Sequence, residues 1–181
     1  MGKLTMQMSI SIDGCVDHTI AIADVDELLE FTSMEFEKTD ILLFGRKCYQ
    51  LMETDWTNVR NDPNATKSFI DFAEKIIAKP KILFSRTLTK ANWNNTILIS
   101  NDAISEVIKL KRQEKNLSIG GIDVSRELMQ NGLIDDILLL VQPVIWGKGR
   151  RLFDGIENRM DMKLVETMKF KSGVVLLHYA I

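Results

Sequence analysis

Two glycine-containing segments of this sequence have the residue types and the spacing that bind phosphate groups. Gly120-Gly121 follows a short apolar run, 116–119, and precedes a stretch of helical character that reaches Asn131-Gly132. A glycine pair between a strand and a helix lets the backbone approach a ligand closely. The first amide groups of such a helix have no partner within it and lie at the positive end of its dipole. The segment therefore suits a phosphate or pyrophosphate, although a plain connecting turn is the commoner meaning of two glycines.

Gly45-Arg46-Lys47 offers a second arrangement of the same kind after the apolar run 40–44. Its two cations stand at the start of a short expected helix, and Ser85-Arg86 brings another arginine after a further apolar run. An arginine side chain can hold a phosphate through two parallel hydrogen bonds. Two such anion sites fit a dinucleotide that carries an extra ribose phosphate. Because the sequence lacks the G-x-G-x-x-G fingerprint, we expect a dinucleotide fold other than the Rossmann type.

The elements that must position these residues alternate between short apolar strands and amphipathic helices. We expect strands at 4–12, 40–44, 81–85, 96–100, 116–119, 135–145, 163–170 and 174–181. We expect helices after a capping pattern at Asp24 and Glu27, over 46–52, from Ala65 to Lys79-Pro80, from a cap at Asn101-Asp102 to about 114, and from 122 to 131. The polar stretch 53–64 is expected to be a loop. Pro143 is expected to mark a bulge or an edge position late in its strand.

This alternation predicts an α/β fold of three layers that forms one domain over residues 1–181. The central sheet is expected to be mainly parallel, with helices on both faces and an antiparallel C-terminal hairpin that turns at 171–173. In such sheets ligands gather at the carboxyl ends of the strands. That edge is expected to carry Asp13-Gly14, Gly45-Arg46, Ser85-Arg86, Ser100-Asn101 and Gly120-Gly121.

The composition excludes several classes of function. The net charge of −2 gives no general attraction to nucleic acid, and no apolar run is long enough to span a membrane. Cys15 and Cys48 are too few for a disulfide framework, and His18 and His178 are too few for a multi-histidine metal site. We therefore expect a cytoplasmic protein that binds no metal, no nucleic acid and no membrane.

Five segments in register carry a resemblance to a known family. They are 9–14, 42–49, 119–121, 132–136, and 143–149 with 152–153. They span nearly the whole chain, and together they resemble the dihydrofolate reductase superfamily. The resemblance is closer to the reductase domain of the riboflavin-biosynthesis deaminase-reductase and its stand-alone bacterial relatives.

The resemblance implies an NADPH-binding reductase, similar to 5-amino-6-(5-phosphoribosylamino)uracil reductase, that passes hydride to an imine or carbonyl carbon of a small substrate. That substrate could be a pyrimidine ribosyl compound or resemble a pterin. The resemblance places Gly45, Arg46 and Lys47, with Ser85 and Arg86, at the 2′-phosphate end of the cofactor. It places the pyrophosphate at Gly120, Gly121, Ile122, Asp123 and Val124, and the nicotinamide near Ser9 and Val16. It also implies a homodimer, to which the apolar stretch 137–141 could contribute, although a core strand is the simpler interpretation.

This sequence departs from the family pattern at one glycine position and at several acidic residues. Ile122 replaces the last of three glycines, and Asp123 would oppose a pyrophosphate if it faced inward. Asp55 is a candidate substrate contact by position only. Asp13 is the candidate catalytic acid, and it could instead orient the cleft loop or close its own turn. A further group of acids, Asp24, Asp26, Glu27 and Glu30, offers no secure match to the acid that faces the pterin in dihydrofolate reductases.

Three interpretations stay open at this point. The first is an NADPH-dependent oxidoreductase with a small heterocyclic or carbonyl substrate. The second is a non-catalytic NADPH-binding or regulatory module with the same fold, suggested by the uncertain acid and by Ile122. The third is a true dihydrofolate reductase. The basic cluster Lys148, Arg150 and Arg151 is either a solvated loop or a phosphate contact for the substrate or the cofactor.

Overall fold

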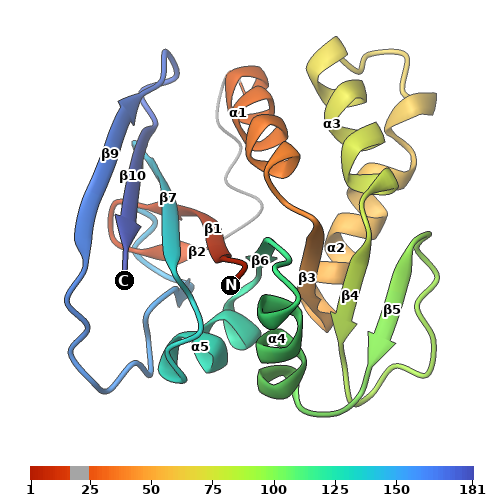
Figure 1. Cartoon of the computed structure of the whole chain (residues 1–181). Helices are drawn as coiled ribbons and strands as arrows, with labels where there is room; N and C mark the ends of the chain where they lie inside the picture. The colour runs from red at the N-terminus through yellow and green to blue at the C-terminus, as the bar shows by residue number, and fades with distance from the viewer. Residues whose placement is uncertain (17–24) are drawn as a thin grey trace.

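Apolar strands from both halves of the chain assemble side by side in one sheet. A computed structural model describes residues 1–16 and 25–181, and Figure 1 shows its elements. The eight strands of the main sheet lie in the order β5-β4-β3-β6-β1-β7-β10-β9. Their bounds are β1 Leu4–Ser11, β3 Ile41–Gly45, β4 Lys81–Phe84, β5 Thr96–Ile99, β6 Leu117–Gly120, β7 Asp136–Gln142, β9 Lys163–Lys169 and β10 Val175–Ala180.

The pairing pattern confirms the expected α/β fold. The six strands from β5 to β7 pair in parallel, and β10 and β9 add antiparallel pairings at one edge. A separate pair joins two short strands, β2 Cys15–Val16 and β8 Arg150–Arg151. The prediction of a single domain over residues 1–181 stays a prediction, although every longer strand belongs to one sheet.

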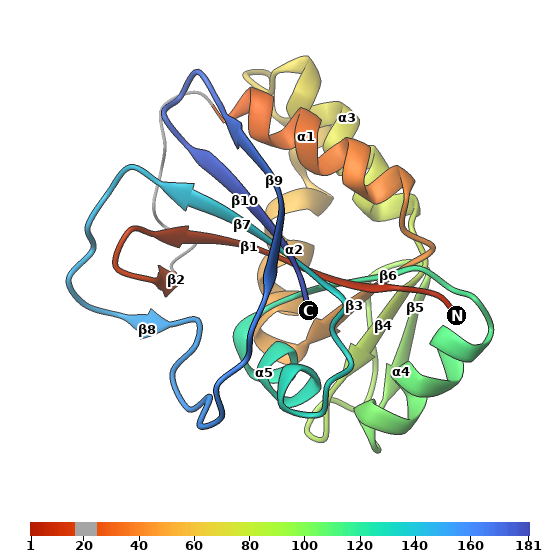
Figure 2. The same ribbon diagram turned by 60° about the vertical axis from the view of Figure 1, so that its left-hand side comes forward.

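Helices cover both faces of the sheet because the strands are apolar on both sides. The helices are α1 Asp26–Glu37, α2 Arg46–Thr57, α3 Lys67–Ala78, α4 Ala103–Arg112 and α5 Ile122–Gln130, with a 3₁₀ turn η1 at Val59–Asn61. Leu43 of β3 packs with the apolar side chains of α4 and α5, whereas its neighbours Leu42 and Phe44 pack with those of α2 and α3. A third cluster joins α1 to β7 and β10. Figure 2 shows α1 and α3 on one side of the sheet and α4 and α5 on the other.

The second helix is longer than the sequence pattern indicates. The stretch 53–64 was expected to be a loop, but α2 continues to Thr57 and is followed by η1. Trp56 explains the difference, because its ring contacts Phe72 of α3 at a centroid distance of 4.5 Å and Phe69 at 5.8 Å. Burial of this one aromatic side chain outweighs the polar character of its neighbours.

The first helix begins one residue later than the predicted capping pattern indicates. The N-cap of α1 is Val25, whose side chain makes no capping hydrogen bond, and Asp24 lies outside the described residues. Glu27 instead accepts hydrogen bonds from the backbone amides of Lys171 at 3.0 Å and Ser172 at 2.7 Å. The carboxylate therefore ties α1 to the turn of the C-terminal hairpin.

The strand expected at 135–145 is shorter in the structure. It ends at Gln142, and the amide of Val144 donates to the carbonyl of Gln142 at 2.7 Å, so the chain turns at Pro143. The strand lies between β1 and β10, and the side chains of 137–140 are buried. This stretch is therefore core and offers no dimer surface.

Candidate functional site

The first turns of α2 and α5 touch each other at the carboxyl edge of the sheet. Phe44 of β3 pairs with Gly120 of β6, so the helices that follow the two strands begin side by side. A Cβ atom added at Gly45 would lie 3.0 Å from a methyl group of Val124. One added at Gly121 would lie 2.9 Å from the Cβ of Cys48. The two segments singled out in the sequence therefore form one surface.

Gly121 has to be glycine for two physical reasons. Its φ of +96° belongs to the region that side chains rarely adopt, and the Cys48 contact leaves no room for a Cβ atom. Gly120 is less constrained, because a Cβ atom there would meet only the Cys48 Sγ at 3.6 Å. Burial raises the pKa of Cys48 to about 12, so this cysteine is a packing residue and not a thiolate nucleophile at neutral pH.

Neither of these two helices is capped by a side chain. The N-caps of α2 and α5 are Gly45 and Gly121, and neither makes a side-chain capping hydrogen bond. In contrast, Thr66 caps α3 and Asp102 caps α4 through their side-chain oxygens. The first amides of α2 and α5 therefore stay open to an outside acceptor. An anion at this edge would meet two helix dipoles at once.

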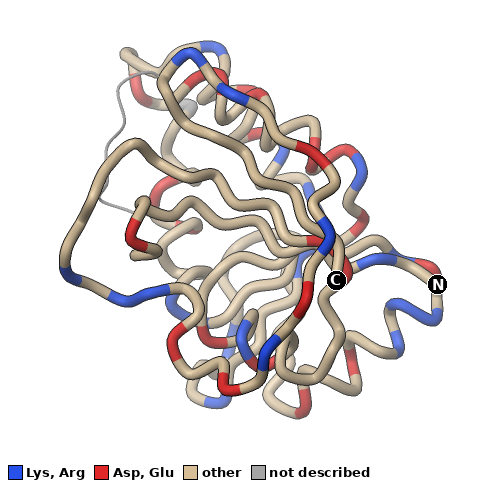
Figure 3. Tube along the Cα trace, turned by 90° about the vertical axis from the view of Figure 1, so that its left-hand side faces the viewer, with Lys and Arg blue, Asp and Glu red and all other residues tan. Residues whose placement is uncertain are grey.

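The cations expected at this edge are present, and they come with one carboxylate. Arg46 and Lys47 lie exposed in the first turn of α2. Asp123, the second residue of α5, forms an ion pair with Arg150 of β8. The hydrogen bond from Arg150 lowers the pKa of Asp123, and the positive charges of Lys47 and Arg126 add to this effect. Figure 3 shows basic segments along the chain between β7 and β9, which contains β8.

Asp13 is a clamp between two loops. Its carboxylate accepts hydrogen bonds from the Ser11 hydroxyl at 2.7 Å and from the amides of Trp146 at 2.9 Å and Gly147 at 2.8 Å. These bonds, that from Ser11 first, hold the pKa of Asp13 far below its ordinary value. An ionised carboxylate does not suit the role of a proton donor. The geometry fits the alternative in which Asp13 orients the cleft loop.

Arg126 of α5 fixes the far end of the same loop. Its Nε donates to the carbonyl of Leu152 at 2.9 Å, and a second guanidinium nitrogen donates to the carbonyl of Arg151. Arg126 and Asp13 thus hold the segment 146–152 between the end of β1 and the start of α5. The basic loop expected from sequence is a structured part of this edge.

The remaining predicted site residues lie at different distances from this edge. Ser85 is buried, and its hydroxyl accepts from the amides of Thr87 and Leu88, so it closes the turn in which Arg86 is exposed. Ser9 is exposed on β1, and Val16 pairs with Arg150. Asp55 is exposed in the last turn of α2, nine residues or about 13 Å along the helix axis from Arg46. The structure therefore does not bring Asp55, the candidate substrate contact, to the carboxyl edge.

Gln142 is a polar residue at this edge that the sequence analysis did not select. It pairs with Ser11 at the ends of β7 and β1, and the residue is only 2% exposed. Its side-chain oxygen has no hydrogen-bond partner within residues 1–16 and 25–181. A buried acceptor without a partner is uncommon in folded proteins. The available signal was a single amide residue that ends an otherwise apolar strand.

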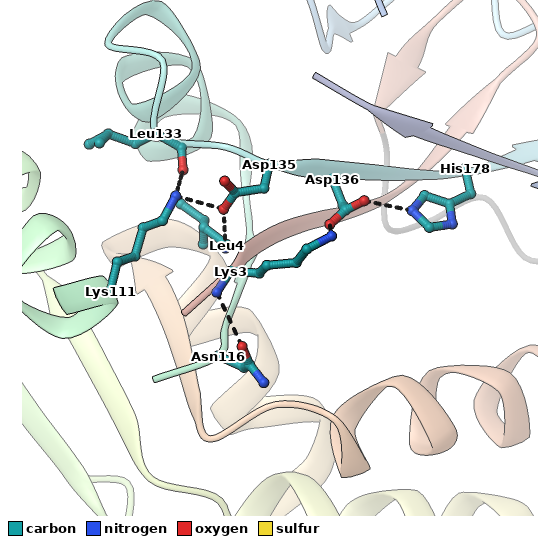
Figure 4. A network of polar contacts seen from close by, with 8 residues as sticks. All are labelled: Lys3, Leu4, Lys111, Asn116, Leu133, Asp135, Asp136 and His178. Atoms are coloured by element: carbon teal, nitrogen blue, oxygen red, sulfur yellow. Dashed lines mark hydrogen bonds and ion pairs between the residues drawn. The ribbon is translucent and has the colours of Figure 1, made fainter. Parts of the chain in front are cut away.

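A separate polar network lies at the opposite, amino edge of the sheet (Figure 4). Asp136 accepts a hydrogen bond from the Lys3 ammonium at 2.8 Å and lies 2.9 Å from the Nε2 of His178. Its neighbour Asp135 accepts from the Leu4 amide at 2.7 Å and from Lys111 at 2.6 Å. A hollow of about 210 Å³ opens beside Asp136 and His178 under the end of α1. These acids hold the beginning of the chain against β7.

Two further observations limit the kinds of site. Among the described residues, no group of three or more His, Cys, Asp or Glu side chains is arranged to hold a metal ion. Among the same residues, no helix has the length and apolar character needed to cross a membrane.

Comparisons with known proteins give one family model and one similar curated protein. A family model described as the RibD C-terminal domain matches residues 2–176. The uncharacterized protein YyaP of Bacillus subtilis (strain 168) is 29% identical over 182 residues, which cover 98% of this chain and 94% of YyaP.

Two solved structures share the fold at low sequence identity. One is a proposed riboflavin biosynthesis protein of Shewanella sp. PV-4, with a TM-score of 0.69, 15% identity and 98% of each chain covered. The other is the diaminohydroxyphosphoribosylaminopyrimidine deaminase/5-amino-6-(5-phosphoribosylamino)uracil reductase of Thermotoga maritima, with a TM-score of 0.67 and 15% identity. The match covers 99% of this chain and 56% of the Thermotoga protein, so this chain spans little more than half of that protein's length.

Proposed function

Because this chain belongs to the RibD C-terminal domain family, we propose that it is an NADPH-dependent reductase that acts on a small heterocyclic or carbonyl substrate. One observation carries the proposal. Two adjacent helices, α2 and α5, begin at glycine N-caps without side-chain caps, and cations surround both N-termini. Helices α3 and α4 are instead capped by side chains, Thr66 for α3 and Asp102 for α4. The two open helix starts suit an anionic ligand.

The chemistry of the residues at this edge fits NADPH. The pyrophosphate would accept hydrogen bonds from the first amides of α5, beyond Gly121, where only a glycine backbone is tolerated. The 2′-phosphate would meet Arg46 and Lys47 at the start of α2, with Arg86 as a further candidate. NADPH supplies a hydride when it is bound. The task of this chain is to hold the nicotinamide and the substrate against each other.

The substrate is expected on the side of the sheet that faces α1, near the ends of β1 and β7. Ser9 and the buried side-chain oxygen of Gln142 lie on these strands. An N–H or O–H group of the substrate would satisfy the Gln142 oxygen, which fits an amide-containing ring such as a pyrimidine. The Thermotoga protein is described as a reductase of such a compound, and this chain is proposed to act on the same class.

A fluorescence titration with NADPH tests the proposal directly. We expect the protein to bind NADPH, and we expect Arg46→Gln together with Lys47→Gln to weaken binding by at least about tenfold, since two phosphate contacts are lost. Lys109→Gln is a suitable control, because it removes an exposed cation from the last turn of α4. No binding at millimolar NADPH would refute the proposal.

The second candidate is an NADPH-binding module without catalysis. The observation that favours it is Asp13, whose carboxylate stays ionised and bound to backbone amides and so is not available to donate a proton. NADPH oxidation, followed at 340 nm with imines, pterins and ribosylated pyrimidines, separates the candidates. Binding without turnover of any substrate would favour the module. Turnover of dihydrofolate with inhibition by methotrexate would instead indicate a true dihydrofolate reductase.

A homodimer and a cytoplasmic location are part of the same proposal. The surface that best suits a second copy is the edge strand β9, where Leu164, Val165 and Met168 are all exposed. An exposed apolar edge strand offers unpaired backbone groups to another chain. Light scattering of the purified protein would show a dimer, and Val165→Lys should shift it toward the monomer. A monomeric wild-type protein would contradict this part.

A further inference from the structure

Asp123 and Arg150 form their ion pair where the cofactor phosphates are proposed to bind. The two guanidinium nitrogens of Arg150 approach the two carboxylate oxygens of Asp123, one of them at 3.4 Å and the other closer. Two parallel contacts are also how arginine binds a phosphate. Asp123 is the second residue of α5, directly after Ile122, so the pair lies beside the open amides of that helix.

Positive charges of α2 and α5 lie close to this pair. The first turn of α2 contains no acid, and Asp123 is the acid in the first turn of α5. Lys47 and Arg126 both lie close enough to act on the Asp123 carboxylate. A carboxylate therefore holds the position in this cationic cluster that a phosphate group of a ligand would otherwise take.

We propose that Asp123 is an internal competitor for the cofactor phosphates and that it sets the affinity of this site by occupying Arg150. The inference rests on the proposed function. When a pyrophosphate binds at the start of α5, Arg150 turns from the carboxylate to the phosphate. The freed Asp123 then repels the bound phosphate, so the site binds its ligand less tightly than its cations alone would allow.

The exchange of Arg150 from Asp123 to a phosphate costs little free energy because the ion pair is open to water. The side chains of Arg150 and Asp123 are 47% and 63% exposed, and exposed ion pairs contribute little to stability. The effect of Asp123 on a phosphate a few ångströms away is larger, since it adds a like charge at short range. Removal of the carboxylate should therefore change ligand affinity much more than it changes folding.

The test is an NADPH titration at low ionic strength with wild type, Asp123→Asn, Arg150→Gln and the double variant. Asp123→Asn should bind NADPH about three- to tenfold more tightly, the effect of one like charge near the phosphates. Arg150→Gln should bind more weakly. In the double variant the gain from Asp123→Asn should shrink, because the two residues act on each other. The gain should also fade at high salt.

The exposed pair Arg159–Asp161 supplies a matched control. Asp161→Asn makes the same charge change in the segment between β8 and β9, and it should leave NADPH affinity unchanged. Unchanged or weaker binding by Asp123→Asn would overturn the inference and would mean that the pair builds the site. A second titration with inorganic pyrophosphate separates the two proposals. One outcome is that no protein binds NADPH but Asp123→Asn binds pyrophosphate more tightly than wild type. This outcome would support Asp123 as a competitor for phosphate groups and would refute NADPH as the cofactor. If neither ligand binds to any variant, both proposals fail.

Discussion

The aspartates at the two edges of the central sheet have opposite surroundings. At the amino edge, Asp136 has a side chain that is 9% exposed and has two partners, Lys3 and His178. At the carboxyl edge, Asp123 has a side chain that is 63% exposed and pairs with one arginine that is also half-exposed. Burial raises the pKa of Asp136, but the bonds from Lys3 and His178 outweigh that effect and lower it. The first acid is locked into the fold, whereas the second can exchange its partner.

The helix ends show the same contrast. At the amino edge, Lys111 in the last turn of α4 donates to the carbonyl of Leu133 and to Asp135, so polar groups there satisfy each other. At the carboxyl edge, α2 and α5 begin without side-chain caps. A folded chain tolerates open amides only where water or a ligand can reach them. The comparison teaches that the charges at the first edge serve stability, whereas at the second edge the charges beside the starts of α2 and α5 stay available for a ligand.

The largest effect on stability is expected at the amino edge. Lys111 is 4% exposed, and Lys111→Ala removes the ammonium donor of the Leu133 carbonyl and one of the two donors to the Asp135 carboxylate. We expect a loss of about 2–4 kcal/mol in the free energy of unfolding, measured in urea. Lys109→Ala on the same helix removes a lysine that is 61% exposed and should cost less than about 0.5 kcal/mol. If the two variants lost equal unfolding free energy, the proposed difference between buried and exposed charges would be wrong.

A second variant measures how tightly the two helix ends at the carboxyl edge are packed. Gly121→Ala forces a side chain into a φ of +96° and against the Cβ of Cys48, so we expect a loss of about 1–3 kcal/mol in unfolding free energy. Gly120→Ala, which meets only ordinary contact, is the control. If Gly121→Ala matched this control in stability, the close approach of α2 and α5 would be wrong.

The pH dependence of stability sharpens the comparison further. Because the pKa of Asp136 is lowered in the folded state, its contribution is present above the unfolded pKa of about 3.9 and is lost as the pH falls through the folded value. Asp136→Asn should therefore be less stable than wild type by about 1–2 kcal/mol at pH 7, and this gap should close in acid. Urea unfolding from pH 7 to pH 2 measures the gap. A gap that stays constant over this range would contradict the assigned interactions.

The smallest effect on global stability is expected from the clamp at the carboxyl edge. Asp13→Asn keeps the shape of the side chain. It removes the negative charge of the carboxylate that accepts hydrogen bonds from the amides of Trp146 and Gly147. We expect faster hydrogen exchange at these two amides with little change in the unfolding midpoint. Ser172→Ala, in the hairpin turn far along the chain, should leave their exchange unchanged. Protection that persists in Asp13→Asn would show that the loop does not depend on the carboxylate.

Much of this architecture could be predicted because it follows from local patterns. Strands such as Leu42–Phe44 are apolar on both sides, and helix α3 repeats its apolar residues at helical spacing, so their positions and their alternation were readable. Two features that were predicted wrongly, the length of α2 and the role of Glu27, depend on contacts between residues far apart in the chain. The last turns of α2 depend on Trp56 meeting α3, and Glu27 binds amides that lie 144 and 145 residues away.

For the candidate site, the sequence by itself determined the residue types: glycines before two helices, cations beside them and a basic loop further along the chain. Glycine permits a left-handed turn and arginine carries its charge wherever the chain places them, so these properties needed no structure. Only the tertiary structure decided that the two glycine turns touch, that Asp13 is a clamp and that Asp123 faces Arg150. These facts depend on contacts between residues far apart in the chain, such as Cys48 with Gly121, and no local pattern encodes such contacts.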